Sequence, residues 1–147
     1  SYNGVAQLNA IVLAVNETAC TPTVAEKTVA ELKAIATEEE KKAAYIVTTK
    51  VAKLGQKDTD TAAGKYGNLW IGEGEDTILV YGATATESAL SYDGLTGLYS
   101  YSNAKDFDSN DLTKDIKVGD TVKLLVIRTS YNGVAQLNAI VLAVNPQ

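Results

Sequence analysis

The feature of this sequence that most restricts its fold is a segment that occurs twice. Residues 1–16 read SYNGVAQLNAIVLAVN, and residues 130–145 repeat them at all sixteen positions. In both copies an Asn-Gly pair precedes an apolar run, a pattern typical of a two-residue hairpin turn followed by a β-strand. The second copy follows a matching strand, TVKLLVIRTS, whereas the first copy follows none. We expect the second copy to close a sheet in this chain and the first copy to pair elsewhere, because an unpaired apolar strand invites aggregation.

The duplication has two interpretations, which the sequence leaves open. In the first, residues 1–16 are the last strand of a preceding, nearly identical domain in a tandem array; the lack of methionine, even at position 1, favours a piece of a longer protein. In the second, residues 1–16 replace residues 130–145 in a neighbouring chain, and repeated exchange builds a fibre. In both cases the expected partners are neighbouring copies of the same domain. The residues expected at that contact are Ser1, Tyr2, Val5, Leu8, Ile11, Leu13 and Val15.

A helical region is predicted after a connector over residues 17–27. Thr28 and Glu31 have the spacing of a capping box, in which each side chain accepts a hydrogen bond from the backbone of the other residue. A second such box begins at Thr37, so we expect the helix to break there and restart.

From Tyr45 onward apolar and polar residues alternate with a period of two, which indicates β-strands. One strand begins there, two more flank the acidic turn GEGED, and the final hairpin adds two. Between them, residues 84–114 are polar and irregular, and we expect a loop and a short helix. Five strands with this long excursion predict an OB-like five-stranded Greek-key barrel, mainly β with an N-terminal α-helix, over residues 28–147. The alternation predicts Leu69, Ile71, Ile78 and Val80 facing inward and Trp70, Leu79 and Tyr81 facing outward.

Composition argues against an enzyme and against a metal or cofactor. The chain contains no histidine, which removes the usual general base and the commonest transition-metal ligand. Residues 106–111, DFDSND, begin like a calcium loop but lack its glycine, and Glu73, Glu75 and Asp76 lie in a turn without a partner for acid–base catalysis. A net charge of −5 disfavours nonspecific binding of nucleic acid. No apolar run approaches the ~20 residues of a membrane span, so we expect no membrane insertion.

Three segments, YGNLWIGEGEDTILVYG, VGDTVKLLVIRTSYNG and AQLNAIVLAV, together resemble the OB-fold domains of secreted and surface proteins of gut Bacteroidetes and similar bacteria. In those domains a helix such as TVAELKAI often precedes the barrel. The resemblance covers residues 28–145 and implies an extracellular or cell-surface location and a binding role without catalytic residues. Such domains usually carry glycine in the first and fourth strands. This chain has Thr49 and Val126 there, so we expect a more open barrel or bulges elsewhere.

Aromatic residues on the outward face predict a binding site. OB folds bind ligands across the second and third strands and the adjacent loops, where exposed rings stack on nucleobases or sugars. The alternative is that these aromatic rings pack beneath the helix or a loop. We expect a non-catalytic binding module of a tandem-repeat or multi-domain surface protein, with single-stranded nucleic acid or glycan as ligand, or else a structural subunit joined head to tail by exchange of the duplicated strand. The predicted ligand contacts are Trp70, Tyr81, Tyr66, Tyr131, Lys65 and Arg128.

Overall fold

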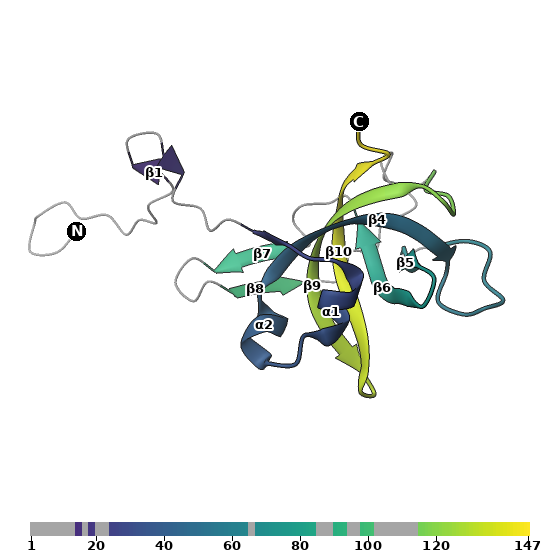
Figure 1. Ribbon diagram of the computed structural model, residues 1–147, viewed down its shortest axis with the longest axis horizontal. Coiled ribbons are helices and arrows are strands. Elements are labelled where there is room, and N and C mark those ends of the chain that lie inside the picture. The colour runs from purple at the N-terminus through teal and green to yellow at the C-terminus, as the bar shows by residue number, and fades with distance from the viewer. Residues whose placement is uncertain are drawn as a thin grey trace, which may run out of the picture.

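A computed structural model describes residues 14–15, 18–19, 24–64, 67–84, 90–93, 98–101 and 115–147 of the chain (Figure 1). These residues form a mainly β structure with two short helices. The elements in chain order are β1 (Ala14–Val15), β2 (Thr18–Ala19), β3 (Ala25–Glu26), α1 (Val29–Ala34), α2 (Glu38–Lys42), β4 (Ala44–Leu54), β5 (Leu69–Glu73), β6 (Asp76–Thr84), β7 (Leu90–Asp93), β8 (Leu98–Tyr101), β9 (Thr121–Tyr131) and β10 (Val134–Val144).

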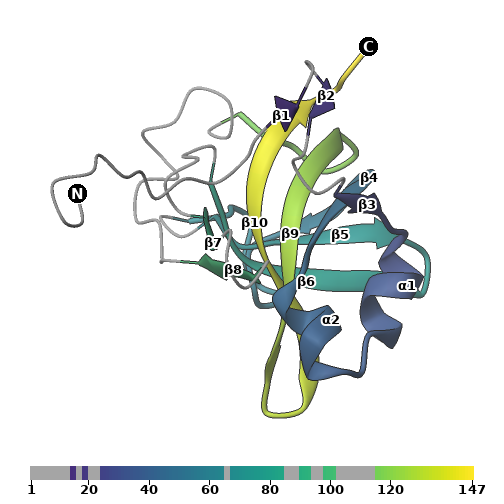
Figure 2. The ribbon, with the colours of Figure 1, turned by 90° about the vertical axis from the view of Figure 1, so that its left-hand side faces the viewer.

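Five strands close into a barrel, as Figure 2 shows from the side. Antiparallel ladders join β4 to β5, β5 to β6 and β10 to β9, and a parallel ladder joins β6 to β10. Seven residue pairs between β4 and β9 complete the circle. Counted along the chain, the five strands therefore follow the order 1-2-3-5-4-1 around the barrel. This arrangement confirms the predicted OB-like Greek-key fold.

The side chains inside the barrel follow the predicted alternation. Tyr81 is 40% exposed on the outer face, as predicted. Leu79 also points outward by its register, but it is only 4% exposed and lies outside the core cluster. Its cross-strand neighbours on this outer face are Trp70 and Gln136. The four residues predicted to face inward are at most 2% exposed: Leu69, Ile71, Ile78 and Val80.

The barrel closes without glycine at Thr49 or Val126, because bulges bend the strands elsewhere. The β4–β5 register shifts between Val51 and Lys53. On β10 the register shifts twice, once against β6 after Leu137 and once against β9 after Val141. Bulges add local twist and bend a strand, which glycine does at barrel corners in related architectures. Of the two expected alternatives, the structure therefore has the bulged one.

The hairpin that joins β9 to β10 has the turn that the sequence predicts. Asn132 and Gly133 both have positive φ, 49° and 78°, as a type I′ turn requires. Asparagine and glycine tolerate this region better than other residues do. The turn places Tyr131 directly opposite Val134 and so determines the register of the whole hairpin.

Three short strand pairings differ from the sequence-based expectations. The predicted connector over residues 17–27 contains β3, which pairs in parallel with β4 through Ala25 and Glu26. Ala14 and Val15 pair with β2 in a small sheet separate from the barrel sheet. The segment predicted as a loop and short helix contains the antiparallel pair β7 and β8. Strands of two to four residues carry too little alternation to be recognised in a sequence.

The helical region breaks where predicted. α1 begins after Thr28, which forms a complete capping box with Glu31. α2 begins after Thr37, whose side chain accepts a hydrogen bond from the Glu40 backbone. These two capping threonines explain why the helical region divides into two short helices, of six and five residues.

α1 packs over an opening of the barrel. Its apolar residues Val29 and Leu32, followed by Ile35, belong to the same buried cluster as the inward side chains of the strands. Arg128 continues the inward face of β9 and is only 7% exposed. Its Nε donates a 3.0 Å hydrogen bond to the Leu32 carbonyl, and its Nη1 donates to the Thr129 carbonyl. A guanidinium at the carboxyl end of α1 satisfies a free carbonyl and complements the helix dipole.

We predict that Arg128→Met lowers the free energy of unfolding by about 1–3 kcal/mol, because it removes buried, charge-assisted hydrogen bonds. Urea denaturation measures this loss, and hydrogen exchange should show faster exchange of the α1 amides. Lys123→Met on the same strand is the control, since Lys123 is only partly buried and is expected to shift stability by less than about 0.5 kcal/mol. Equal effects of the two substitutions would contradict this role of Arg128.

Candidate functional site

The candidate site is a pocket of about 340 Å³ on the outer face of the barrel. It lies where β6, β9 and β10 meet the loop between β4 and β5. This is the region of an OB barrel that the third strand shares with the loops joining strands 1–2 and 4–5, where such folds bind ligands. The residues that line it are Gln56, Tyr81, Thr129, Ser130, Tyr131, Gln136 and Asn138.

Tyr81 is held in this pocket by a bulge in β6. Two β6 residues, Tyr81 and Gly82, lie opposite the single residue Asn138 of β10. Gly82 adopts φ 88°, which favours glycine, and its N–H donates a 3.0 Å hydrogen bond to Asn68 Oδ1. Asn138 Nδ2 donates to the Tyr81 carbonyl at 2.6 Å. The two asparagine side chains therefore satisfy the backbone groups that the bulge leaves unpaired, and bulges commonly re-aim a side chain in this way.

The second aromatic residue of the pocket is Tyr131 at the tip of β9. It is 65% exposed, because the type I′ turn follows it immediately. Two tyrosine rings from different strands thus border one pocket, both with substantial free surface. Tyrosine presents an apolar ring together with a hydroxyl that can donate or accept a hydrogen bond.

Trp70 lies on the same outer face but is engaged with the protein. Its Nε1 donates a 3.2 Å hydrogen bond to the Gln56 carbonyl. Lys53 Nζ lies 5.1 Å from the centre of the indole ring, within the range of a cation–π contact, and is also 2.8 Å from Asp58. Trp70 therefore anchors the loop that carries Gln56 into the pocket.

The loop between β4 and β5 is ordered further by Asp60. The backbone N–H groups of Lys57 and Gln56 donate hydrogen bonds of 2.8 and 2.9 Å to Asp60 Oδ2. These two bonds, that from Lys57 first, hold the pKa of Asp60 below its usual value. A carboxylate that accepts two backbone donors fixes the path of the loop, so Gln56 is presented from a defined position.

The other predicted contacts have different places in the chain. Arg128 does not line the pocket, because its guanidinium points into the barrel and donates a hydrogen bond to the Leu32 carbonyl of α1. Burial lowers the pKa of Arg128, which nevertheless remains charged at neutral pH. Lys65 and Tyr66 lie outside the described residues. Tyr81 and Tyr131 are therefore the two predicted contacts that the structure brings together.

Five polar residues of the pocket were not anticipated from the sequence. The sequence does contain a signal for the two that lie on β10. Polar side chains at alternate positions of an otherwise apolar strand indicate that this face of the strand is turned outward and makes polar contacts. The remaining three come from a loop and from the end of β9, whose approach depends on tertiary structure. The five residues are Gln136, Asn138, Gln56, Thr129 and Ser130.

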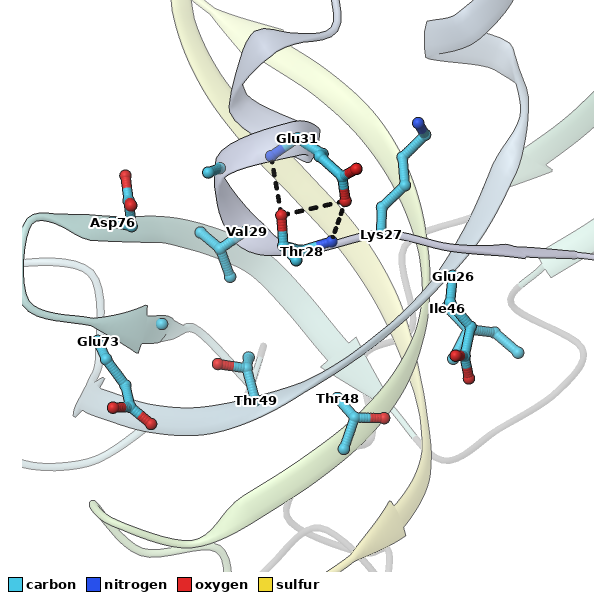
Figure 3. A pocket seen from close by; sticks show the side chains of 12 residues that line it. Glu26, Lys27, Thr28, Val29, Glu31, Ile46, Thr48, Thr49, Glu73 and Asp76 are labelled. Carbon is cyan, nitrogen blue, oxygen red and sulfur yellow. Dashed lines mark hydrogen bonds between the residues drawn. The ribbon is translucent and has the colours of Figure 1, made fainter.

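A larger pocket, of about 510 Å³, lies between α1, β3, β4 and the turn joining β5 to β6 (Figure 3). Figure 3 shows the Glu31 side chain turned back to Thr28, where it accepts the backbone N–H at 2.7 Å. Glu73 pairs with Lys50, and Asp76 pairs with Lys33. Three of the four carboxylates that line this pocket thus have partners in the protein, which favours a structural role.

Among the described residues, no group of three or more Asp, Glu or Cys side chains could hold a metal ion. The acidic segment at residues 106–111 lies outside that part of the chain. None of the described helices is long and apolar enough to cross a bilayer.

Comparisons with known proteins give no match. No protein-family model matches the chain, and searches of curated proteins and of solved structures find no similar protein.

The capping box of α1 is expected to make the stability of the fold depend on pH. Hydrogen bonds from Thr28, that of the backbone first, lower the pKa of Glu31 in the folded state. A carboxylate with a depressed pKa stabilises the fold above its unfolded pKa of ~4.3, and this contribution is lost as the pH falls through the folded pKa. Glu31→Gln is therefore expected to be less stable than the wild type at pH ~7, with a difference that narrows below pH ~4.

Thermal unfolding measured across this pH range tests the prediction. Glu75→Gln, in the exposed turn between β5 and β6, is the control for loss of one negative charge. A stability difference for Glu31→Gln that stays constant with pH would show that the carboxylate is not responsible.

Proposed function

We propose that this chain is a non-catalytic OB-fold binding module of a secreted or cell-surface protein, whose ligand stacks on exposed aromatic rings. The ligand classes are a glycan and a single-stranded nucleic acid. The observation that carries this proposal is the pair of exposed rings, Tyr81 and Tyr131, bordering one pocket on the face where OB folds bind ligands. The resemblance to OB-fold domains of surface proteins supports the location.

The construction of the pocket supports a binding role further. Three side chains fix the backbone that carries Tyr81 and Gln56 into it: Asn68 accepts from the Gly82 N–H, Asn138 donates to the Tyr81 carbonyl, and Trp70 donates to the Gln56 carbonyl. Side chains fixed before a ligand arrives lose less conformational freedom on binding, which raises affinity. A pocket volume of 340 Å³ is within the range of ~300–1,000 Å³ found for small-ligand sites.

The single tryptophan provides the measurement. Trp70 contacts the loop that carries Gln56, so binding in the pocket is expected to change its fluorescence. Tyr81→Ala and Tyr131→Ala should each weaken binding by about 1–3 kcal/mol, or about 5- to 150-fold, because each removes one stacking ring. Tyr81→Phe and Tyr131→Phe retain the rings and should bind more tightly than the alanine variants.

Val118→Ala is the control. Val118 is also exposed, at 60%, but it precedes the first residue of β9, whereas Tyr131 is the last residue of that strand. It should leave affinity unchanged. The proposal fails if neither oligosaccharides nor oligonucleotides bind, or if both alanine variants bind as the wild type does.

We also propose a second function, assembly through the duplicated segment into a tandem array or a head-to-tail fibre. The observation that favours it is the closed barrel, in which β10 is already paired with both β6 and β9. Residues 1–16 have the sequence of this strand and its turn, so they can make the same pairings only in another barrel whose closing position is free.

The burial of β10 allows a selective test of exchange between chains. Leu137, the counterpart of Leu8, is fully buried, whereas Val134, the counterpart of Val5, is 59% exposed. Leu8→Asp should therefore dissociate exchanged assemblies into monomers, because it buries an unpaired charge in the accepting barrel. Val5→Asp places the same charge where the barrel is open to solvent and should leave assemblies intact.

Sedimentation measures the outcome. A wild-type chain that remains monomeric at high concentration would exclude exchange between chains. Equal dissociation by both substitutions would show that the segment associates by some contact other than barrel closure.

A further inference from the structure

We propose that the ligand of the outer-face pocket is an uncharged oligosaccharide. This inference rests on the proposed binding function and selects one of its two ligand classes. None of the seven described lining residues carries a formal charge. The site instead combines two tyrosine rings with amide and hydroxyl groups.

The amides suit a ligand rich in hydroxyl groups. The side chains of Gln56 and Gln136 each offer a carbonyl acceptor and an NH₂ donor, and a sugar hydroxyl can donate to the first and accept from the second. Asn138 uses its Nδ2 on the Tyr81 carbonyl, which leaves Oδ1 to accept a hydrogen bond from a ligand hydroxyl. Thr129 and Ser130 add hydroxyls beside Tyr131. The apolar faces of sugar rings can then cover the exposed tyrosine rings.

The charges around the pocket, in the part of the chain that the structure describes, do not favour a polyanion. Binding of a nucleic acid draws its affinity from lysines and arginines that replace counterions at the phosphates. In the adjoining loop the Lys53 ammonium pairs with Asp58 at 2.8 Å. The carboxylate of Asp60, which accepts the backbone N–H of Lys57, adds a negative charge to this loop. Arg128 is buried at α1. With a net charge of −5 over the whole chain, an uncharged ligand meets no electrostatic barrier here.

The experiment compares five probes on the full chain by calorimetry and by Trp70 fluorescence. They are short neutral oligosaccharides of glucose, of xylose and of mannose, and, as anionic counterparts, an oligogalacturonate and an oligothymidylate. We expect at least one neutral oligosaccharide to bind, with an affinity that is unchanged between ~50 and ~200 mM salt. Both anionic probes should bind more weakly than that sugar.

Gln136→Leu tests the hydrogen bonds separately from the rings. It keeps the size of the side chain and removes the amide, so affinity for the neutral sugar should fall about tenfold or more. Gln56→Ala, in the loop, is a second variant should Gln136→Leu disturb the strand. Thr48→Val is the control, because Thr48 lines the other pocket and should leave sugar binding unchanged.

The outcomes separate this inference from the proposed function. Binding of the oligothymidylate with a steep salt dependence, and no binding of neutral sugars, would overturn the inference while the binding function stands. Tighter binding of the oligogalacturonate than of every neutral sugar would overturn the uncharged character of the ligand. Binding of none of the probes would overturn both proposals.

Discussion

The structure depends on one contact, the parallel ladder between β6 and β10 that lets the sheet close on itself. Through it β10 lies between β6 and β9, and the inward side chains Leu137, Ala139 and Val141 complete the core. The same strand turns Gln136 and Asn138 outward into the pocket. Because a strand alternates its faces, β10 supplies both part of the barrel core and two of the seven residues that line the candidate site.

That closing strand is also the one whose sequence occurs twice. Four of the seven lining residues of the pocket lie in the duplicated segment, and each has an identical counterpart near the amino end of the chain. A neighbouring barrel closed by that segment would therefore carry the same polar and aromatic half of the pocket. The counterparts of Ser130, Tyr131, Gln136 and Asn138 are Ser1, Tyr2, Gln7 and Asn9. Assembly and binding would in that case share this segment and remain compatible.

Several polar side chains that could be taken for ligand contacts instead form hydrogen bonds that stabilise the fold. Arg128 fills the last inward position of β9 and reaches the end of α1. Asn68 and Asn138 stabilise the bulge at Gly82, and Asp60 orders the loop before β5. Buried or half-buried polar groups need such partners, since leaving them unsatisfied costs free energy. Tyr81 and Tyr131, in contrast, keep much of their ring surface exposed to solvent.

The sequence by itself determined the local features of this protein. The capping threonines at 28 and 37, the Asn132-Gly133 turn and the inward residues of β5 and β6 follow from spacing and alternation, which depend on neighbours along the chain. The five strands and the long excursion between the third and the fourth also predicted the barrel, although its closure joins distant segments. Tertiary structure alone decided that Arg128 faces α1, that Trp70 holds Gln56, and that five polar residues join two tyrosines in one pocket. Those relations depend on strand register and on bulges, which bring distant segments together and leave almost no periodic signal in the sequence.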